Sequence, residues 1–158
     1  MNYTHYSQVF LDQVNKYGDR VAMRYKPKDK WEEISWNQFG DLVRNTSKAL
    51  LECGIGEQET VGIFSQNMPL WTVADIASLC IRGIPVPIYA TNTAKQAEYI
   101  INDAEIKVLF VGDAEQYSKI MQILPENKYL QKIIVFKESV PIQKSEKIMY
   151  FKDFLKIG

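Results

Sequence analysis

Four short apolar runs at a nearly constant spacing constrain the fold of this chain more than any other feature. They are VGIFSQ (61–66), IPVPIY (84–89), VLFV (108–111) and IIVF (133–136), with centres 22 to 25 residues apart. Runs that are apolar at successive positions are typical of strands buried on both faces. Each interval has room for one helix and two short loops, the length of a βαβ crossover. The pattern predicts an α/β fold, a mostly parallel sheet with helices on both faces.

Helix-capping signals fill the later intervals between these runs. Thr93 and Gln96 have the spacing of a capping box, and the residues that follow share an apolar face. Asp113 is a candidate N-cap for the next helix, which Pro125 is expected to end. Both intervals are therefore predicted to be helical.

The first interval also has helix signals. Asn67 lies two residues before Pro69, which favours an N-cap followed by an early helical proline. Gly83 is expected to end this helix. The residues expected to face the sheet are Trp71, Ala74, Ala77 and Cys80.

The N-terminal part of the chain precedes the sheet. A first helix is expected at about 6–17, followed by a hairpin whose strands, 21–26 and 31–35, are separated by PKDK. Ser35 begins a capping box that opens a longer helix, and Gly54 is expected to end that helix. This region is predicted to be a helix and a β-hairpin in front of the parallel sheet.

The strand 84–89 contains a conflict, because Pro85 and Pro87 lack the N–H that a sheet ladder needs. Residues two apart in a strand send their N–H groups to the same side, so both missing donors face one neighbour. Losing two ladder bonds is too costly for an ordinary central strand. We therefore expect continuous pairing on one side only, with the proline side at a sheet edge, at an irregular pairing or against a covering part of the protein.

Composition is that of a soluble globular domain. The 158 residues, 46% hydrophobic and 24% charged, suffice for one domain with a real core. A formal net charge of zero gives no basic surplus for nucleic acid. Cys53 and Cys80 have no zinc-ligand spacing and, without a secretory leader, are typical of reduced thiols in a cytoplasmic protein. The longest apolar region, 70–89, is interrupted by charges and prolines and predicts no membrane span.

The turns at strand ends are the candidate binding positions. Ser65-Gln66-Asn67 and the Tyr89–Thr93 loop lie at carboxyl ends of predicted strands, where ligands bind in open α/β sheets. Capping of the helices that follow also explains these residues. Asp113 is a single carboxylate at another strand end. A receiver-type phosphorylation site would need a cluster of carboxylates at strand ends. Gly54-Ile55-Gly56 precedes a strand, which is typical of a helix end and a turn rather than of a nucleotide loop.

Three weaker features have ordinary structural explanations. Met68 and Trp71 could line an acyl-chain tunnel, but such side chains at the start of an amphipathic helix usually belong to the core. His5, near the terminus, is expected to be inert. The lysine-rich segment 137–156, which ends in an expected short helix at KDFLK (152–156), could contact a membrane surface. A face exposed to solvent is the better explanation, because that helix is very short.

Residues 59–112 closely resemble the adenylate-forming enzymes, specifically the long-chain fatty acyl-CoA synthetases. The most specific parts are SQNMPLW, GIPVPIYAT and TAKQAEYIINDAEIKVLFV. The upstream segment WEEISWNQFGDLVRNTSKALLECGI is similar to the family's entry helix after a hairpin. The resemblance extends from about Ser7 to Phe136, which is most of the chain.

The resemblance implies an AMP-forming ligase, in which ATP and a fatty acid form an acyl-adenylate with Mg²⁺ before coenzyme A takes the acyl group. The family's phosphate loop, Mg²⁺-binding acidic group, ribose-binding aspartate and C-terminal lysine have no match in this sequence. We therefore assign no catalytic, cofactor-binding or metal-binding residue. Residues 1–158 are expected to form a single domain, the N-terminal subdomain of such a ligase, with the catalytic remainder and the C-terminal domain absent from the chain.

The chain alone is accordingly expected to be inactive and to bind none of ATP, Mg²⁺ or coenzyme A. The expected partner of the parent enzyme is a fatty acid, with peripheral membrane contact left open and nucleic acid excluded. A parallel sheet needs cover on both faces, so an unfinished surface predicts an exposed apolar patch on a sheet face or edge, or self-association. A stand-alone α/β binding or interaction module without catalysis is the alternative.

Overall fold

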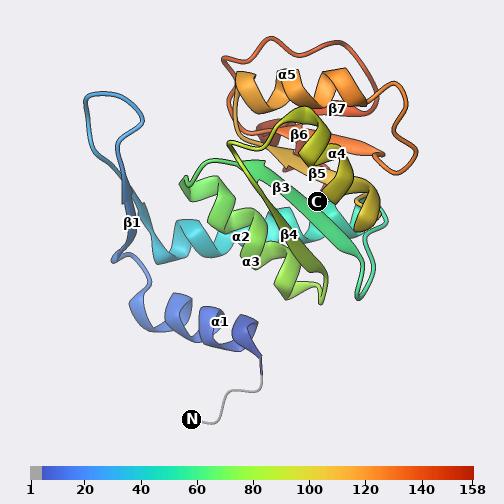
Figure 1. The fold of residues 1–158 in the computed structure, drawn as a ribbon. Coiled ribbons are helices and arrows are strands. Elements are labelled where there is room, and N and C mark those ends of the chain that lie inside the picture. The colour runs from blue at the N-terminus through green and yellow to red at the C-terminus, as the bar shows by residue number, and fades with distance from the viewer. Residues whose placement is uncertain (1–4) are drawn as a thin grey trace.

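A five-stranded parallel sheet organises the part of the chain that the computed structural model describes, residues 5–158 (Figure 1). Its spatial order is β4-β3-β5-β6-β7. The strands are β3 (Thr60–Ser65), β4 (Ile84–Tyr89), β5 (Val108–Val111), β6 (Lys132–Val135) and β7 (Ile148–Tyr150). Four of them are the predicted apolar runs, which confirms the α/β class, and β7 adds a fifth strand that the apolar runs did not predict.

Helices cover both faces of the sheet, as predicted. They are α1 (Tyr6–Tyr17), α2 (Trp36–Glu52), α3 (Pro69–Cys80), α4 (Ala94–Asp103), α5 (Ala114–Ile123) and the short α6 (Phe151–Phe154). On one face α2, α3 and α6 pack against alternate strand residues such as Ile63 and Phe110. On the other face α4 and α5 pack against the intervening residues, such as Phe64 and Leu109. Burial on both faces is the reason why the strand sequences are apolar at successive positions.

The predicted N-terminal hairpin is formed by β1 (Val21–Tyr25) and β2 (Glu32–Ser35), which pair antiparallel. The base of the hairpin and α1 pack on α2, and the loop of the hairpin extends away from the sheet (Figure 1). Phe10 of α1 meets Phe39 of α2 edge to face, with ring centroids 4.8 Å apart. The predicted capping box at Ser35 is present at the start of α2.

The start of α3 differs from the prediction by one residue. Met68, rather than Asn67, is the N-cap, and no side chain caps this helix end. The physical reason is Pro69, which occupies the first helical position and makes the residue immediately before it extended. Ala74 and Ala77 are buried as predicted, whereas Trp71 and Cys80 are only half-buried; the buried residues of the helix are Val73, Ala74, Ile76, Ala77 and Ser78.

Helix α3 ends at Cys80, shortly before Gly83, the residue expected to end it. The left-handed conformation after the helix is adopted by Arg82, whose φ is 62°. Gly83 is instead required by close packing, because a Cβ there would lie 3.2 Å from the carbonyl of Ser78 and 3.3 Å from that of Glu59. The next N–H, that of Ile84, donates to Glu59 and starts the pairing of β4 with β3.

The prediction for Pro85 and Pro87 is confirmed. Strand β4 is an edge strand, and it pairs with β3 continuously from Ile84 to Tyr89. Since the N–H of Ile84 points to β3, the nitrogens of the two prolines face outward, where no neighbouring strand lies. Ile84 and Tyr89, at the two ends of this edge strand, are 42% and 81% exposed, and an apolar patch or self-association at the edge stays a prediction.

Candidate functional site

The carboxyl ends of β3 and β5 form the topological switch point of the sheet. From β3 the chain passes through α3 on one face to reach β4, whereas from β5 it passes through α5 on the opposite face. The two loops therefore diverge and leave a crevice between neighbouring strand ends, which is where open α/β sheets bind ligands. The loop after β3 carries Ser65, Gln66 and Asn67, and the loop after β5 carries Gly112 and Asp113.

Asp113 is the centre of a polar network in this crevice. One carboxylate oxygen accepts a hydrogen bond of 2.7 Å from the Gln66 amide and one of 3.3 Å from the Lys137 ammonium. The other accepts from the backbone N–H of Glu115 at 3.1 Å and so caps α5. Burial by itself raises the pKa of Asp113, but these three donors outweigh it and lower the pKa below its ordinary value. The carboxylate is ionised and fully engaged with groups of the chain itself.

Gly112 allows the two loops to approach closely. A Cβ at this position would lie 2.5 Å from the Ser65 hydroxyl oxygen and 2.7 Å from the Gln66 amide oxygen, closer than any side chain could be accommodated. The Gly112 N–H donates to the carbonyl of Phe64, at 3.0 Å. The amide oxygen of Gln66 is buried and accepts no hydrogen bond within the described residues. The crevice is therefore filled by its own side chains, and it offers no free cationic group to a phosphate.

The loop after β4 meets the same end of the sheet. The Ala90 carbonyl accepts hydrogen bonds from the side chains of Gln116 at 3.1 Å and Lys119 at 3.4 Å, both on α5. Thr93 caps α4 through the predicted capping box, and Asp113 and Gln116 form a capping box on α5. Capping thus explains Thr93 and Asp113, whereas Asn67 is not the cap of α3.

A pocket of about 310 Å³ brings the two predicted binding loops together. It lies between the ends of β3 and β4 and the start of α3. Trp71 of α3 contributes its half-buried side chain, and Tyr89 stands at the exposed edge. The complete lining is Ser65, Gln66, Asn67, Trp71, Pro87, Ile88, Tyr89, Ala90 and Thr91. This lining supplies apolar surface and hydroxyl groups but no charged side chain.

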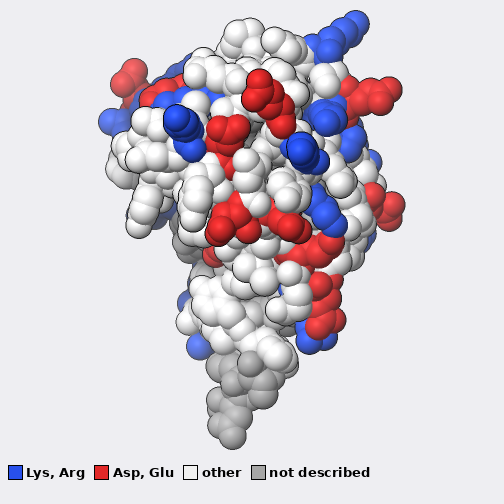
Figure 2. All heavy atoms as spheres, turned by 45° about the vertical axis from the view of Figure 1, so that its right-hand side comes forward, with Lys and Arg blue, Asp and Glu red and all other residues white. Residues whose placement is uncertain are grey.

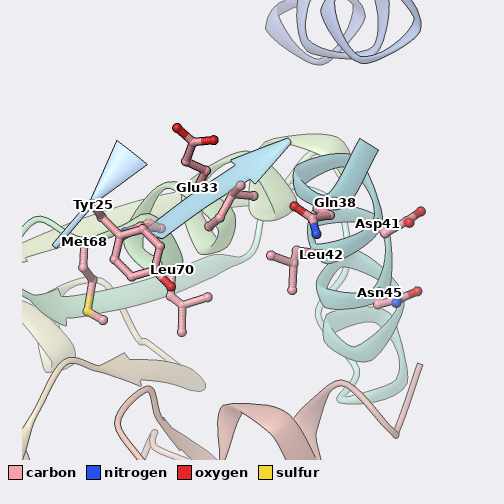
Figure 3. Close-up of a pocket in the computed structure, with 10 residues that line it drawn as sticks. Tyr25, Glu33, Gln38, Asp41, Leu42, Asn45, Met68 and Leu70 are labelled. Carbon is pink, nitrogen blue, oxygen red and sulfur yellow. The ribbon is translucent and has the colours of Figure 1, made fainter. Parts of the chain in front are cut away.

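A larger pocket, of about 620 Å³, lies between the hairpin, α2 and the start of α3 (Figure 3). Leu42, Met68 and Leu70 contribute to its apolar part, so Met68 lines this pocket whereas Trp71 lines the smaller one. The Tyr25 hydroxyl donates to Glu32, and this hydrogen bond, together with burial, raises the pKa of Tyr25. No nucleophile with an adjacent general base is present in the lining, so the pocket has the properties of a packing surface rather than of a catalytic site.

The remaining candidates have structural explanations. His5 is exposed at the start of α1 and makes no capping hydrogen bond through its side chain. Gly54 has a φ of 79° at the end of α2, which confirms the helix end that the sequence predicts. In the lysine-rich segment, Phe151 and Phe154 of α6 are buried and belong to the core. Over residues 5–158 we find no group of three His, Cys, Asp or Glu side chains able to hold a metal ion.

No helix in the described part of the chain combines the length and the apolar character needed to cross a bilayer. Lys and Arg are interspersed with Asp and Glu on the face that Figure 2 shows. No single-sign surface is visible there.

The fold is an open, doubly wound α/β domain of the kind that presents loops at the carboxyl edge of its sheet. The sequence of residues 10–152 matches the model of the AMP-binding enzyme family, and the chain belongs to this family. It is 31% identical to the long-chain-fatty-acid–CoA ligase ACSBG2 of Xenopus laevis, over 96% of this chain and 20% of that protein. It is 30% identical to the human long-chain-fatty-acid–CoA ligase ACSBG1, over 96% of this chain and 21% of that protein. The chain thus spans about a fifth of the length of these relatives.

The fold is also that of a solved adenylate-forming structure. The anthranilate CoA ligase AuaEII in complex with anthranoyl-AMP superposes with a TM-score of 0.85 at 21% sequence identity, over 98% of this chain and 28% of that chain. The similarity covers nearly the whole of this chain. At this identity it establishes the fold.

The sequence placed Ser65-Gln66-Asn67, Tyr89–Thr93 and Asp113 at strand ends, and the structure brings all of them to one edge. The direct contact of Gln66 with Asp113 and the participation of Lys137 were not predicted. The contact of Gln66 depends on β5 lying beside β3, and that of Lys137 on β6 lying beside β5. Only the strand order reveals these pairings.

Proposed function

We propose that this chain is the N-terminal subdomain of an ATP-dependent long-chain fatty acid:CoA ligase of the cytoplasm. The parent would join ATP and a fatty acid to an acyl-adenylate and then transfer the acyl group to coenzyme A. One observation carries the proposal: several relatives that match 96% of this chain at 28–31% identity are named long-chain-fatty-acid–CoA ligases. The fold of the anthranilate CoA ligase supports it.

The described residues do not fit ATP, Mg²⁺ or coenzyme A by themselves. Asp113, the carboxylate at the switch point, already accepts hydrogen bonds from Gln66, Lys137 and the start of α5. Over residues 5–158 no group of three His, Cys, Asp or Glu side chains is placed to hold a divalent cation. We therefore assign the binding of all three to parts of the parent outside this chain.

The contribution of this subdomain would be positional. Its sheet is rigid, since β3 and β5 are buried on both faces and capping boxes fix α4 and α5 at the carboxyl edge. A loop held on such an edge keeps its geometry while other parts of an enzyme move. The pocket of about 310 Å³, with its apolar and hydroxyl lining, would then serve as one wall of a larger site.

The first test is the activity of the isolated chain. We expect no exchange of pyrophosphate into ATP in the presence of palmitate, because the charge stabilisation that phosphoryl chemistry needs has no residues to supply it here. The Xenopus laevis ligase serves as the positive control. Turnover above a blank without protein would contradict the assignment of catalysis to the remainder of the parent.

The second test separates the ligase from the alternative, a stand-alone module. A chimera would carry this chain in place of the 151 matched residues of the Xenopus laevis ligase. We expect it to form palmitoyl-CoA, whereas the same ligase lacking the segment should not. A chimera that is folded by circular dichroism and gel filtration but forms no acyl-CoA would count against the proposal. Reading the coding sequence beyond Gly158 provides an independent check, because the ligase requires a phosphate loop there.

A further inference from the structure

The loop of the N-terminal hairpin combines an exposed aromatic ring with a group of lysines. Residues 26–31 join β1 to β2 at the end of the hairpin that extends away from the sheet (Figure 1). Trp31 is 67% exposed, and Lys26, Lys28 and Lys30 are all exposed. The base of the same hairpin is anchored, since Ala22, Met23 and Ile34 pack against the core. A fixed stem thus carries a protruding tip.

The three lysines have no carboxylate partner within residues 5–158. The ion pairs of the hairpin region lie lower on its strands, where Arg24 binds Glu33 at 2.7 Å. Glu32 accepts the hydroxyl of Tyr25 at 2.6 Å. In the loop itself Asp29 is the one acidic residue, so three lysines against one aspartate leave two net positive charges at the tip.

Among the described residues 5–158, Trp31 has no aromatic ring contact that would explain its position. The aromatic cluster at the base of the hairpin consists of Phe10, Tyr17, Trp36 and Phe39 and does not include it. An indole exposed on a protruding loop, with an apolar ring and a polar N–H, is available to an interface that is apolar at one end and wet at the other. Tryptophan is enriched at the boundary of membranes, where its ring lies among headgroups, and lysines beside it are attracted by anionic lipid.

We propose that the hairpin tip docks the protein onto an anionic lipid bilayer, with Trp31 at headgroup level and Lys26, Lys28 and Lys30 on the charged surface. A small protruding segment is enough to contact a bilayer, whereas a nucleic acid binds along an extended basic surface. The formal net charge of zero gives no basic surplus for such a surface. The loop also offers a single exposed aromatic ring, not the series on which successive bases stack.

The test uses the whole chain without ATP or coenzyme A, so its result is independent of the ligase proposal. Binding is measured by co-sedimentation with phosphatidylcholine vesicles, with and without phosphatidylserine. We expect binding that requires phosphatidylserine, weakens with salt and shifts the tryptophan emission to the blue. The emission shift should disappear in Trp31→Ser, because Trp36 and Trp71 remain half-buried in the fold.

Two matched sets of variants separate the tip from the overall charge. Each lysine near an anionic surface contributes about five-fold in affinity, so Lys26→Gln/Lys28→Gln/Lys30→Gln should weaken binding by at least about ten-fold. The control Lys95→Gln/Lys128→Gln/Lys144→Gln removes the same charge from exposed positions elsewhere and should change binding by about two-fold or less. Tyr99→Ser, at a residue 69% exposed on α4, is the control for Trp31→Ser.

Three outcomes would overturn the proposal. In the first, both lysine triples weaken vesicle binding equally, which makes net charge the cause. In the second, the emission of the bound wild-type chain equals that of the free chain, so Trp31 does not enter the headgroup region. In the third, vesicles do not bind, while a single-stranded oligonucleotide binds and loses affinity with the tip variants. Circular dichroism of every variant verifies that the fold is retained.

Discussion

Replacing Asp113 with alanine tests whether the polar network at the switch point holds the sheet edge together. The substitution removes three interactions at once: the cap of α5, the acceptor for the Gln66 amide and the partner of Lys137. A lost N-cap costs about 1 kcal/mol. An amide left without its acceptor in a partly buried crevice costs roughly 1–2 kcal/mol. The ion pair adds at most a few tenths, because Lys137 is 44% exposed.

The expected loss is therefore about 2–3 kcal/mol, or roughly 4–12 °C in the midpoint of thermal unfolding for a domain of this size. Thr93→Ala is the matched control, because it removes the capping hydroxyl of α4 at an exposed position where no second network is attached. It should cost about 1 kcal/mol. Urea unfolding followed by circular dichroism measures both variants. If Asp113→Ala is no more destabilising than Thr93→Ala, Gln66 and Lys137 contribute nothing and the network argument is wrong.

The same carboxylate makes a prediction about pH. Because the folded state lowers the pKa of Asp113 below its ordinary value of 3.8, the ionised group stabilises the fold at every pH above that value. The contribution is lost as the pH falls from there through the lowered pKa. As the pH is lowered from neutral into the acid range, the free energy of unfolding of Asp113→Asn should therefore fall less than that of the wild type. Parallel acid-unfolding curves for wild type and variant would refute this reasoning.

Three further substitutions probe the backbone. Gly62→Ala on β3 would place a Cβ 2.6 Å from a side chain of β5 and should destabilise by roughly 1–3 kcal/mol in urea, whereas Gly56→Ala has room and should not. Arg82→Gly should stabilise by roughly 0.5–1 kcal/mol, since the φ of 62° is strained for arginine; a destabilised variant would contradict this. Pro85→Val/Pro87→Val gives the exposed edge two outward donors and should increase self-association in light scattering; unchanged scattering would show that the prolines do not protect the edge.

Local sequence signals predicted local structure well. The capping boxes at Ser35 and Thr93 depend on residues three apart, and both are present. The edge position of β4 also followed from the sequence, because Pro85 and Pro87 lack the N–H groups that regular pairing on that side would need. The boundaries of α3 were less accurate, since Pro69 moved the cap to the residue next to it and close packing determined Gly83.

Non-local features could not be read in this way. Strand β7 is three residues long and follows a polar segment, so its apolar run resembled many loop segments. It becomes a strand because β6 offers it a free side to pair with. The contact between Gln66 and Asp113 joins residues 47 apart in sequence and exists because β5 lies beside β3. The sequence of neither loop indicates that β3 and β5 are neighbours in the sheet.

Helix α2 precedes every strand that it covers, and this order has a consequence during synthesis. Its buried residues Phe39, Val43 and Leu50 belong to the same cluster as Val61 of β3 and Phe110 of β5. On the ribosome the helix emerges before those strands do, so its apolar stripe can pack against α1 and the hairpin before it meets the sheet. Translation has to proceed past Val111 before the inner strands can cover it. Until then the nascent chain carries an exposed helical stripe, the kind of surface that chaperones shield from aggregation.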